Sequence, residues 1–263
     1  MKRLLLTILG VLMIGWLGAA LWFRMQYHTL YFPFDTQSYP ASIAGAGVTR
    51  VDLDGLDVLL HEPRGDRPVI LYFVGNLGNP LRQGPVLREY VVNGYGLVAP
   101  SYRAEGVGEG QLVADALAVA RAVDDLLAAD VPPERLVIHG TSLGSGIATA
   151  VAVEVAAAGL ILETPFTRLC DVPGRHVPLL PYCLLSGGNR LATIERIDRI
   201  EMPLLVQHGD MDRLVPFDMG QAVFEAARQP KQFIAYPGGD HNDLRLHGAG
   251  IDARAFADRV TAR

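Results

Sequence analysis

Hydrophobic and polar positions alternate along most of the chain in the order expected of strands followed by helices. Nearly continuous apolar runs at 68–74, 96–100 and 136–138 are typical of strands that are covered on both faces of a sheet. Between the last two runs, 111–129 has the apolar spacing of an amphipathic helix. The alternation predicts an α/β fold, with a mostly parallel central sheet and helices on both faces.

The second half of the chain continues this alternation. It predicts strands at 159–163, 202–208 and 231–236, a helix at 218–228 and a closing helix from residue 242 onward. Ligands bind beyond the carboxyl ends of the strands in such sheets. Residues that directly follow a strand are therefore the candidates for a functional site.

Two segments depart from the alternation. In 48–60, apolar and polar residues alternate on both sides of Asp54-Gly55, which indicates a β-hairpin. From 164 to 199 the regular spacing is interrupted by Pro173, Pro178, Pro181 and Gly187-Gly188. We expect an insertion over about 165–200, after the sixth strand.

The amino-terminal stretch from Leu4 to Phe23 contains no charged residue. Twenty residues of this kind can cross a bilayer as a helix. We therefore divide the chain into a transmembrane anchor at 1–25, a linker at 26–47 and one domain at 48–263. A cleaved signal peptide is the alternative, because Gly18-Ala19-Ala20 resembles a signal peptidase site.

The charges around this stretch predict its orientation. Lys2, Arg3 and the amino terminus precede it, whereas Arg24 alone follows it directly. By the positive-inside rule the amino terminus lies in the cytoplasm, and the domain is extracytoplasmic or periplasmic. We expect a single-pass membrane protein.

Composition and charge argue against several classes of function. The chain has 263 residues, half of them hydrophobic, and a formal net charge of −5. No basic stripe is present, so nucleic acid is not an expected partner. The chain has no metal-ligand spacing and no dinucleotide-binding glycine motif, so we expect no metal and no cofactor. No protein partner can be inferred.

A Gly-x-Ser-x-Gly motif, Gly140 to Gly144, directly follows the apolar run at 136–138. A small-residue segment at 147–158 follows it and is expected to form a helix. This context is that of a nucleophile elbow, a sharp turn from strand to helix that exposes a serine. Both glycines must lack side chains because the two elements nearly touch there. Ser142 is therefore the candidate nucleophile.

A serine hydroxyl needs a base and a group that orients the base. Asp210 and Asp212 follow the strand at 202–208, and His241 follows the last strand. The order Ser, Asp, His is the one that α/β-hydrolases use. His139 and His208 end strands and are interpreted as scaffold residues.

The motifs as a set resemble the α/β-hydrolase superfamily, and within it the Bem46-like and ABHD13-like serine hydrolases that carry an amino-terminal membrane segment. The corresponding stretches are Val74-Gly75-Asn76-Leu77-Gly78, Tyr102-Arg103-Ala104, the elbow, His208 to Pro216, and Asp240-His241-Asn242. The His-Gly-x-x-Asp spacing selects Asp212 over Asp210. Asp210, Asp240 and Asp243 are then expected to be local turn or solubility residues.

The resemblance also implies an oxyanion hole. Its donors would be the backbone N–H of Leu143, which follows the nucleophile, and that of Asn76. Two residues depart from the family pattern, because Val74 replaces a histidine and Ala104 replaces a glycine. The donors are backbone groups, so the hole does not depend on the missing histidine. The replacement of the histidine by Val74 instead affects how firmly the loop that follows, Gly75-Asn76, is held in place.

The expected activity is a serine esterase that forms an acyl-enzyme on Ser142. In this fold the insertion after the sixth strand usually forms a lid, and the apolar segment 179–185 can line a pocket for an acyl lipid. Acyl transfer to another acceptor, peptide hydrolysis and a non-catalytic membrane-tethered binding protein are the alternatives. Cys170 and Cys183 either form a disulfide or remain free thiols.

Overall fold

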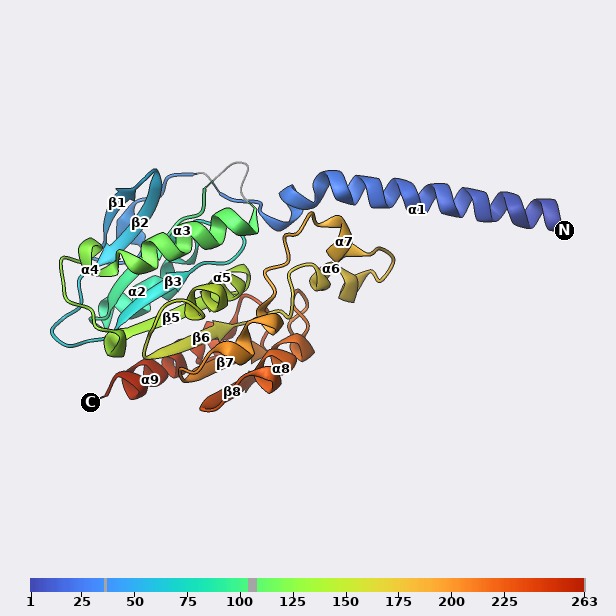
Figure 1. Ribbon diagram of the computed structural model, residues 1–263. Coiled ribbons are helices and arrows are strands. Elements are labelled where there is room, and N and C mark those ends of the chain that lie inside the picture. Colours follow the sequence, from blue (N-terminus) through green and yellow to red (C-terminus); the bar gives the residue numbers. More distant parts are fainter. Residues whose placement is uncertain (36, 104–107, 263) are drawn as a thin grey trace.

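The central sheet of the molecule matches the predicted alternation (Figure 1). The computed structural model describes residues 1–35, 37–103 and 108–262. In that part of the chain eight strands form one sheet in the order β1-β2-β4-β3-β5-β6-β7-β8. The strands are β1 (Thr49–Leu53), β2 (Leu56–His61), β3 (Val69–Phe73), β4 (Gly96–Pro100), β5 (Leu136–Thr141), β6 (Gly159–Glu163), β7 (Leu204–Gly209) and β8 (Lys231–Tyr236).

The sheet is parallel except at one edge. β1 and β2 form the predicted hairpin, with Asp54 and Gly55 both at positive φ in the turn. β2 is antiparallel to β4, and every later pairing is parallel. Every residue of β3 to β7 is buried, as expected for strands covered on both faces. The predicted mostly parallel sheet is confirmed.

Helices cover both faces of the sheet. One apolar cluster joins the strands to α3 (Glu109–Arg121), α5 (Leu143–Ala152) and α8 (Phe217–Ala226). A second cluster, on the opposite face, joins them to α2 (Gly84–Val92) and α9 (Ala249–Thr261). Short helical turns complete this part of the fold: η2 (Pro80–Gln83), α4 (Val123–Leu126), η3 (Pro133–Arg135), η4 (Thr193–Glu195), η5 (Ile197–Arg199) and η6 (Leu244–His247).

Several helix boundaries differ from the predicted ones. The helix predicted at 111–129 breaks after Arg121 into α3 and α4. The elbow helix, predicted at 147–158, begins at Leu143 because the turn is completed at Ser142, and it ends at Ala152. The residues after it return to the sheet, where the Ala158 N–H donates to Leu136 O. The closing segment divides into η6 and α9 at Gly248, which has a φ of 99°.

The amino-terminal helix α1 (Lys2–Tyr31) projects from the domain (Figure 1). It is long and apolar enough to cross a membrane, and it continues past the predicted end of the anchor at residue 25. Most of its side chains are exposed, but Phe23 and Tyr31 near its end are buried in the core of the domain. The following chain leads through η1 (Ala41–Ile43) to the hairpin.

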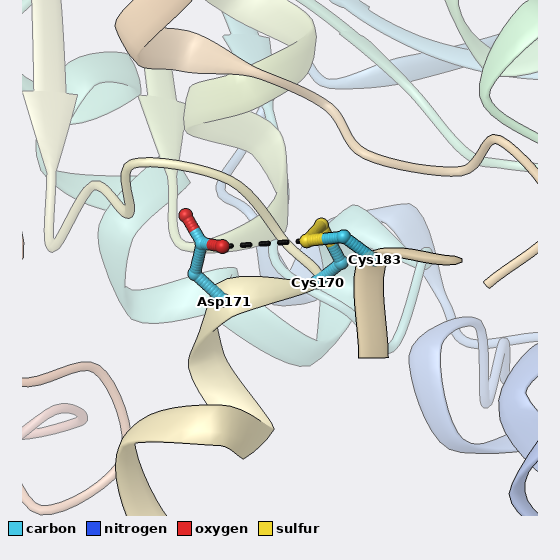
Figure 2. A group of neighbouring side chains, drawn as sticks. All are labelled: Cys170, Asp171 and Cys183. Carbon is cyan, nitrogen blue, oxygen red and sulfur yellow. Dashed lines mark hydrogen bonds between the residues drawn. A yellow bond between two sulfur atoms is a disulfide. The ribbon is translucent and has the colours of Figure 1, made fainter. Parts of the chain in front are cut away.

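The insertion after β6 contains two short helices, α6 (Asp171–His176) and α7 (Tyr182–Leu185). A disulfide joins Cys170 to Cys183, so the alternative of two free thiols is wrong for this structure (Figure 2). Asp171 Oδ1 lies 3.3 Å from Cys183 Sγ. These three residues are close enough to resemble a metal site. Sulfurs that are bonded to each other are not the thiolates that bind metals, so the group is a structural cross-link.

Candidate active site

The turn at Ser142 has the strained backbone of a nucleophile elbow. Ser142 has φ 52° and ψ −118°, and it lies between the last residue of β5 and the first of α5. A Cβ on Gly140 would lie 2.3 Å from Gly144 O, and one on Gly144 would lie 2.0 Å from Phe73 O. Neither contact is sterically possible. The close approach of β3, β5 and α5 therefore requires both glycines of the motif.

The structure brings Ser142, Asp212 and His241 together. His241 Nε2 lies 2.9 Å from Ser142 Oγ, and its Nδ1 lies 2.8 Å from Asp212 Oδ2. The three residues follow β5, β7 and β8, whose carboxyl ends lie at the same edge of the sheet. Asp212 and His241 are both buried. An imidazole placed in this way can take a proton from the serine while a carboxylate orients it.

The surroundings of Asp212 keep its carboxylate ionised. Burial by itself would raise the pKa of Asp212, but hydrogen bonds from His208 and His241 outweigh it and hold the pKa well below its usual value. The backbone N–H groups of Leu214 and Val215 also donate to Oδ1, at 2.9 and 2.8 Å. His208 is fully buried, in agreement with its interpretation as a scaffold residue.

Asp210 occupies a different position. It is exposed, and its Oδ1 accepts a hydrogen bond of 2.7 Å from the Gly238 N–H. Of the two aspartates, only Asp212 contacts His241 among the described hydrogen bonds. The choice of Asp212 that the family resemblance implied is thus the one that the geometry favours.

Asp240 does more than complete a local turn. Its Oδ1 accepts from the backbone N–H of Arg213 at 3.0 Å and from that of His241 at 2.8 Å. Its Oδ2 accepts from Arg213 Nε at 2.8 Å. These bonds lower the pKa of Asp240 to about 2, with the Arg213 N–H as the largest cause. Asp240 therefore ties the loop that carries Asp212 to the loop that carries His241. Sequence reasoning missed this role, whereas Asp243 makes the expected local bond to the Asp240 N–H.

The two predicted oxyanion donors lie beside Ser142. Leu143 is the first residue of α5, and its N–H and that of Asn76 make no hydrogen bond to another group in the described part of the protein. Both residues line the apolar cavity that contains Ser142. Unpaired N–H groups, one of them at the start of α5, are free to donate hydrogen bonds to a developing oxyanion.

The loop after Val74 is held without the usual histidine. The Tyr102 hydroxyl donates to Val74 O at 2.6 Å, and the Tyr102 N–H donates to Gly78 O at 2.7 Å. Burial raises the pKa of Tyr102 well above its usual value, so the hydroxyl keeps its proton. The other departure, Ala104, lies outside the described residues.

The chain after α1 braces the same loop from the other side. The Asp35 N–H donates to Leu77 O at 2.7 Å, and Asn79 Nδ2 donates to Gln37 O at 2.9 Å. Phe34 packs so closely on Gly78 that a Cβ there would lie 2.7 Å from the ring. The segment predicted as a linker is thus part of the packing around the candidate site.

Two cavities meet at Ser142. One, of about 280 Å³, is largely apolar and is lined by residues of α1, the insertion and the elbow, among them Phe23, Tyr31, Phe166, Leu169 and Val172. The other, of about 270 Å³, is more polar and is lined by Asn76, Arg82, Gln83, His241 and Asn242, among others. Leu214 borders both cavities, and His176 Nε2 lies 2.9 Å from its carbonyl oxygen.

Comparison with known proteins shows the family. No protein-family model matches the chain. It is 31% identical over 261 residues to an uncharacterized protein of Mycobacterium tuberculosis (strain ATCC 25618 / H37Rv), covering 95% of this chain and 89% of that protein. It is 28% identical over 272 residues to the alpha/beta hydrolase domain-containing protein WAV2 of Arabidopsis thaliana, covering 89% and 87%. The chain belongs to the α/β-hydrolase superfamily.

Other similar proteins match over less of their own length or show the fold alone. The lysophosphatidylserine lipase ABHD12 of Danio rerio is 30% identical over 192 residues, which are 64% of this chain and 49% of that protein. Among solved structures, an esterase 2 from Thermogutta terrifontis has a TM-score of 0.65 at 22% identity, over 85% of this chain and 96% of that one. A membrane phospholipase A has a TM-score of 0.60 at 18% identity, over the full length of both chains.

This α/β-hydrolase carries a buried ion network beneath the elbow. Glu163 ends β6, and its backbone oxygen accepts a 2.8 Å hydrogen bond from the Ser142 N–H. Its carboxylate lies 3.6 Å from both Arg245 Nη2 and His139 Nε2. Burial would raise the pKa of Glu163, but the Arg245 and His139 side chains outweigh it and lower that pKa. His139 is thus a scaffold residue, as interpreted from the sequence. A charged residue at the end of an apolar strand is the signal that could have found Glu163.

Proposed function

We propose that the protein is a serine hydrolase that cleaves a carboxylic ester, including the ester of an acyl lipid, through an acyl-enzyme on Ser142. The observation that carries the proposal is the position of His241, within hydrogen-bond distance of Ser142 Oγ on one side and of Asp212 Oδ2 on the other. A nucleophile, a base and an orienting carboxylate in this arrangement are what acyl transfer to a serine needs.

In the first half of the reaction, Ser142 Oγ attacks the ester carbonyl while His241 Nε2 takes the serine proton. The amides of Leu143 and Asn76 hold the oxygen of the tetrahedral intermediate. When this intermediate collapses, the bond to the alcohol breaks and His241 returns the proton to the leaving oxygen. In the second half, water attacks the acyl-enzyme with His241 as base, which releases the acid and restores Ser142. Asp212 stays ionised and stabilises the imidazolium in both halves.

The cavities support an ester with two unlike ends. The apolar cavity suits an acyl chain, and the polar cavity beside Arg82 and Asn242 suits a polar alcohol portion. Two proteins of this fold carry names that agree with such a substrate, the lysophosphatidylserine lipase ABHD12 and the membrane phospholipase A. An acyl lipid is therefore the substrate class that we favour over a small soluble ester.

We also propose that α1 is an uncleaved single-pass anchor and that the domain is extracytoplasmic. Lys2 and Arg3 at the start of α1 support this orientation by the positive-inside rule. The Cys170–Cys183 disulfide supports it independently, because disulfides persist mainly outside the reducing cytoplasm. The burial of Phe23 and Tyr31 in the domain supports an anchor that remains attached.

Ser142→Ala tests the proposed activity. The full chain is purified in detergent, and a fluorophosphonate probe and a short p-nitrophenyl ester report on the nucleophile and on turnover. We expect the wild type to be labelled and to hydrolyse the ester, and the variant to lose both properties. Ser42→Ala, at an exposed serine of η1, is the matched control and should retain both. Labelling of the Ser142→Ala variant at another residue would refute the assignment.

A further inference from the structure

We infer that residues 177–185 of the insertion, here called the lid tip, lie within the bilayer beside α1. Together with α1 they form a lateral entrance through which the acyl chain of a membrane lipid reaches Ser142. The inference rests on the proposed function and on the proposed anchor, and it names both the partner surface, a lipid bilayer, and the route of the substrate.

The first observation is that the membrane helix itself forms part of the acyl cavity. Phe23, Leu30 and Tyr31 of α1 line the same cavity as Ser142 and Leu143. Phe23 is the last residue of the uncharged stretch of α1. At Phe23 the wall of the cavity is therefore continuous with the uncharged surface of α1, whereas Leu30 and Tyr31 lie beyond Arg24, on the side of the domain.

The second observation is that the lid tip packs along α1 (Figure 1). The rings of Phe23 and Tyr182 meet edge to face with centroids 4.8 Å apart. About two helical turns toward the amino terminus, Trp16 Nε1 donates a 2.7 Å hydrogen bond to the carbonyl oxygen of Leu179. Two contacts at different heights thus fix the lid tip against the side of the helix.

The hydrogen bond from Trp16 sets the depth of the lid tip. Arg24 is the first charged residue after the apolar stretch, so it marks the headgroup level. Trp16 precedes it by eight residues, which places the indole about 12 Å along the helix from Arg24 at ~1.5 Å per residue. Half of the hydrocarbon core is only about 15 Å thick. The carbonyl group of Leu179 therefore lies in hydrocarbon, where Trp16 supplies the donor that water cannot.

The lid tip has the composition that hydrocarbon requires. It contains no charged residue. Three of its apolar side chains are exposed, Val177 by 48%, Leu179 by 67% and Leu184 by 80%, whereas Leu180, Tyr182 and Leu185 pack against the domain. Pro178 and Pro181 have no backbone N–H that would need a partner. Backbone bonds within the insertion use the N–H groups of Val177, Leu179, Tyr182, Leu184 and Leu185. These exposed leucines are unfavourable in water and favourable in lipid.

The arrangement indicates how the substrate arrives. The ester groups of membrane lipids lie at the boundary between hydrocarbon and headgroups, which is the level of Phe23 and Arg24 on α1. A lipid that moves sideways between α1 and the lid tip can place its acyl chain in the apolar cavity without leaving the bilayer. Its polar portion then faces the cavity that contains Arg82.

Depth-dependent quenching tests the position of the lid tip. The full chain with Leu184→Cys is labelled with a nitrobenzoxadiazole dye under non-reducing conditions and reconstituted into mixed phosphatidylcholine and phosphatidylglycerol vesicles. We expect blue-shifted emission that is quenched by lipids with a doxyl group on the acyl chain. Leu246→Cys, at a leucine that is 87% exposed and far from the insertion in sequence, is the matched control and should report water. Water-like emission at Leu184 would overturn the inference, as would a blue shift that disappears when the protein is diluted to one copy per vesicle.

A charge in the lid tip tests the route of the substrate. In Leu184→Glu we expect hydrolysis of a fluorogenic phospholipid in vesicles to fall by about tenfold or more, because a carboxylate is costly in hydrocarbon. Hydrolysis of a short soluble ester should match that of the wild type and of Leu246→Glu. Equal loss on both substrates, or no loss on either, would refute the lateral entrance. Failure of the wild type to hydrolyse any ester would instead refute the proposed function.

Discussion

The geometry around Asp212 makes a sharp prediction for the variant Asp212→Asn. Two backbone N–H groups donate to Oδ1, so the single oxygen of an asparagine must take that place. The amide NH₂ then replaces Oδ2 and donates to Nδ1 of His241, which lies 2.8 Å away. The imidazole must carry its proton on Nε2, where it faces Ser142 Oγ and can no longer accept the serine proton.

The expected loss follows from this reversed tautomer. We predict that kcat falls by about 10³ to 10⁴, which corresponds to about 4 to 5.5 kcal/mol, while KM changes little. The assay is hydrolysis of a short p-nitrophenyl ester by the detergent-solubilised full chain, with thermal unfolding by circular dichroism as a check on folding. Asp210→Asn is the matched control and should stay within about twofold of the wild type, since an asparagine oxygen can still accept the Gly238 N–H. If a folded Asp212→Asn variant kept activity within tenfold of the wild type, the assigned role of Asp212 would be wrong.

Three further variants probe the support of the site. Tyr102→Phe removes the hydrogen bond to Val74 O. We expect kcat to fall by about tenfold, because the loop after Val74, which carries the proposed oxyanion donor Asn76, becomes less rigid. The unfolding temperature checks that the variant is folded. Asp240→Asn should lower the unfolding temperature at pH 7. Because the pKa of Asp240 is lowered to about 2, its stabilising contribution is present above its ordinary pKa of about 4 and is lost as the pH falls through 2, so wild type and variant should converge below pH 2. Gly144→Ala should prevent accumulation of folded protein, at a cost of about 3 kcal/mol or more, whereas Gly110→Ala, in open space on a helix, should raise stability slightly.

The elements of the site that depend on local sterics could be predicted from the sequence. The spacing of Gly140 and Gly144 around Ser142 reflects how closely β5 and α5 approach, and these two elements are adjacent in the sequence. The meeting of Asp212 with His241 could be expected because parallel strands end at one edge of the sheet. The order of strands along the sheet, and hence the antiparallel pairing of β2 with β4, has no such local signal in the sequence.

Contacts between distant segments could not be predicted. Every residue from 4 to 23 contributes to the same hydrophobic average, so the sequence does not reveal that Phe23 packs into the domain while Trp22 stays exposed. The pairing of Asp240 with Arg213 depends on two loops that fold side by side, and it leaves no pattern in either loop. The irregular spacing of the insertion sets it apart in the sequence, but its two helices, of six and four residues, are too short to show a helical period.

The burial of Phe23 and Tyr31 has a practical consequence for how the enzyme is studied. A fragment that begins after α1 would lack one wall of the apolar cavity beside Ser142 and would expose the apolar core surface that this wall covers. Such a fragment would tend to aggregate, and any activity it kept would favour short, water-soluble esters whose acyl groups need no wall. A substrate screen on the truncated protein would then report the preference of a damaged cavity. Biochemical work on this chain should therefore keep its first thirty-one residues and supply them with lipid or detergent.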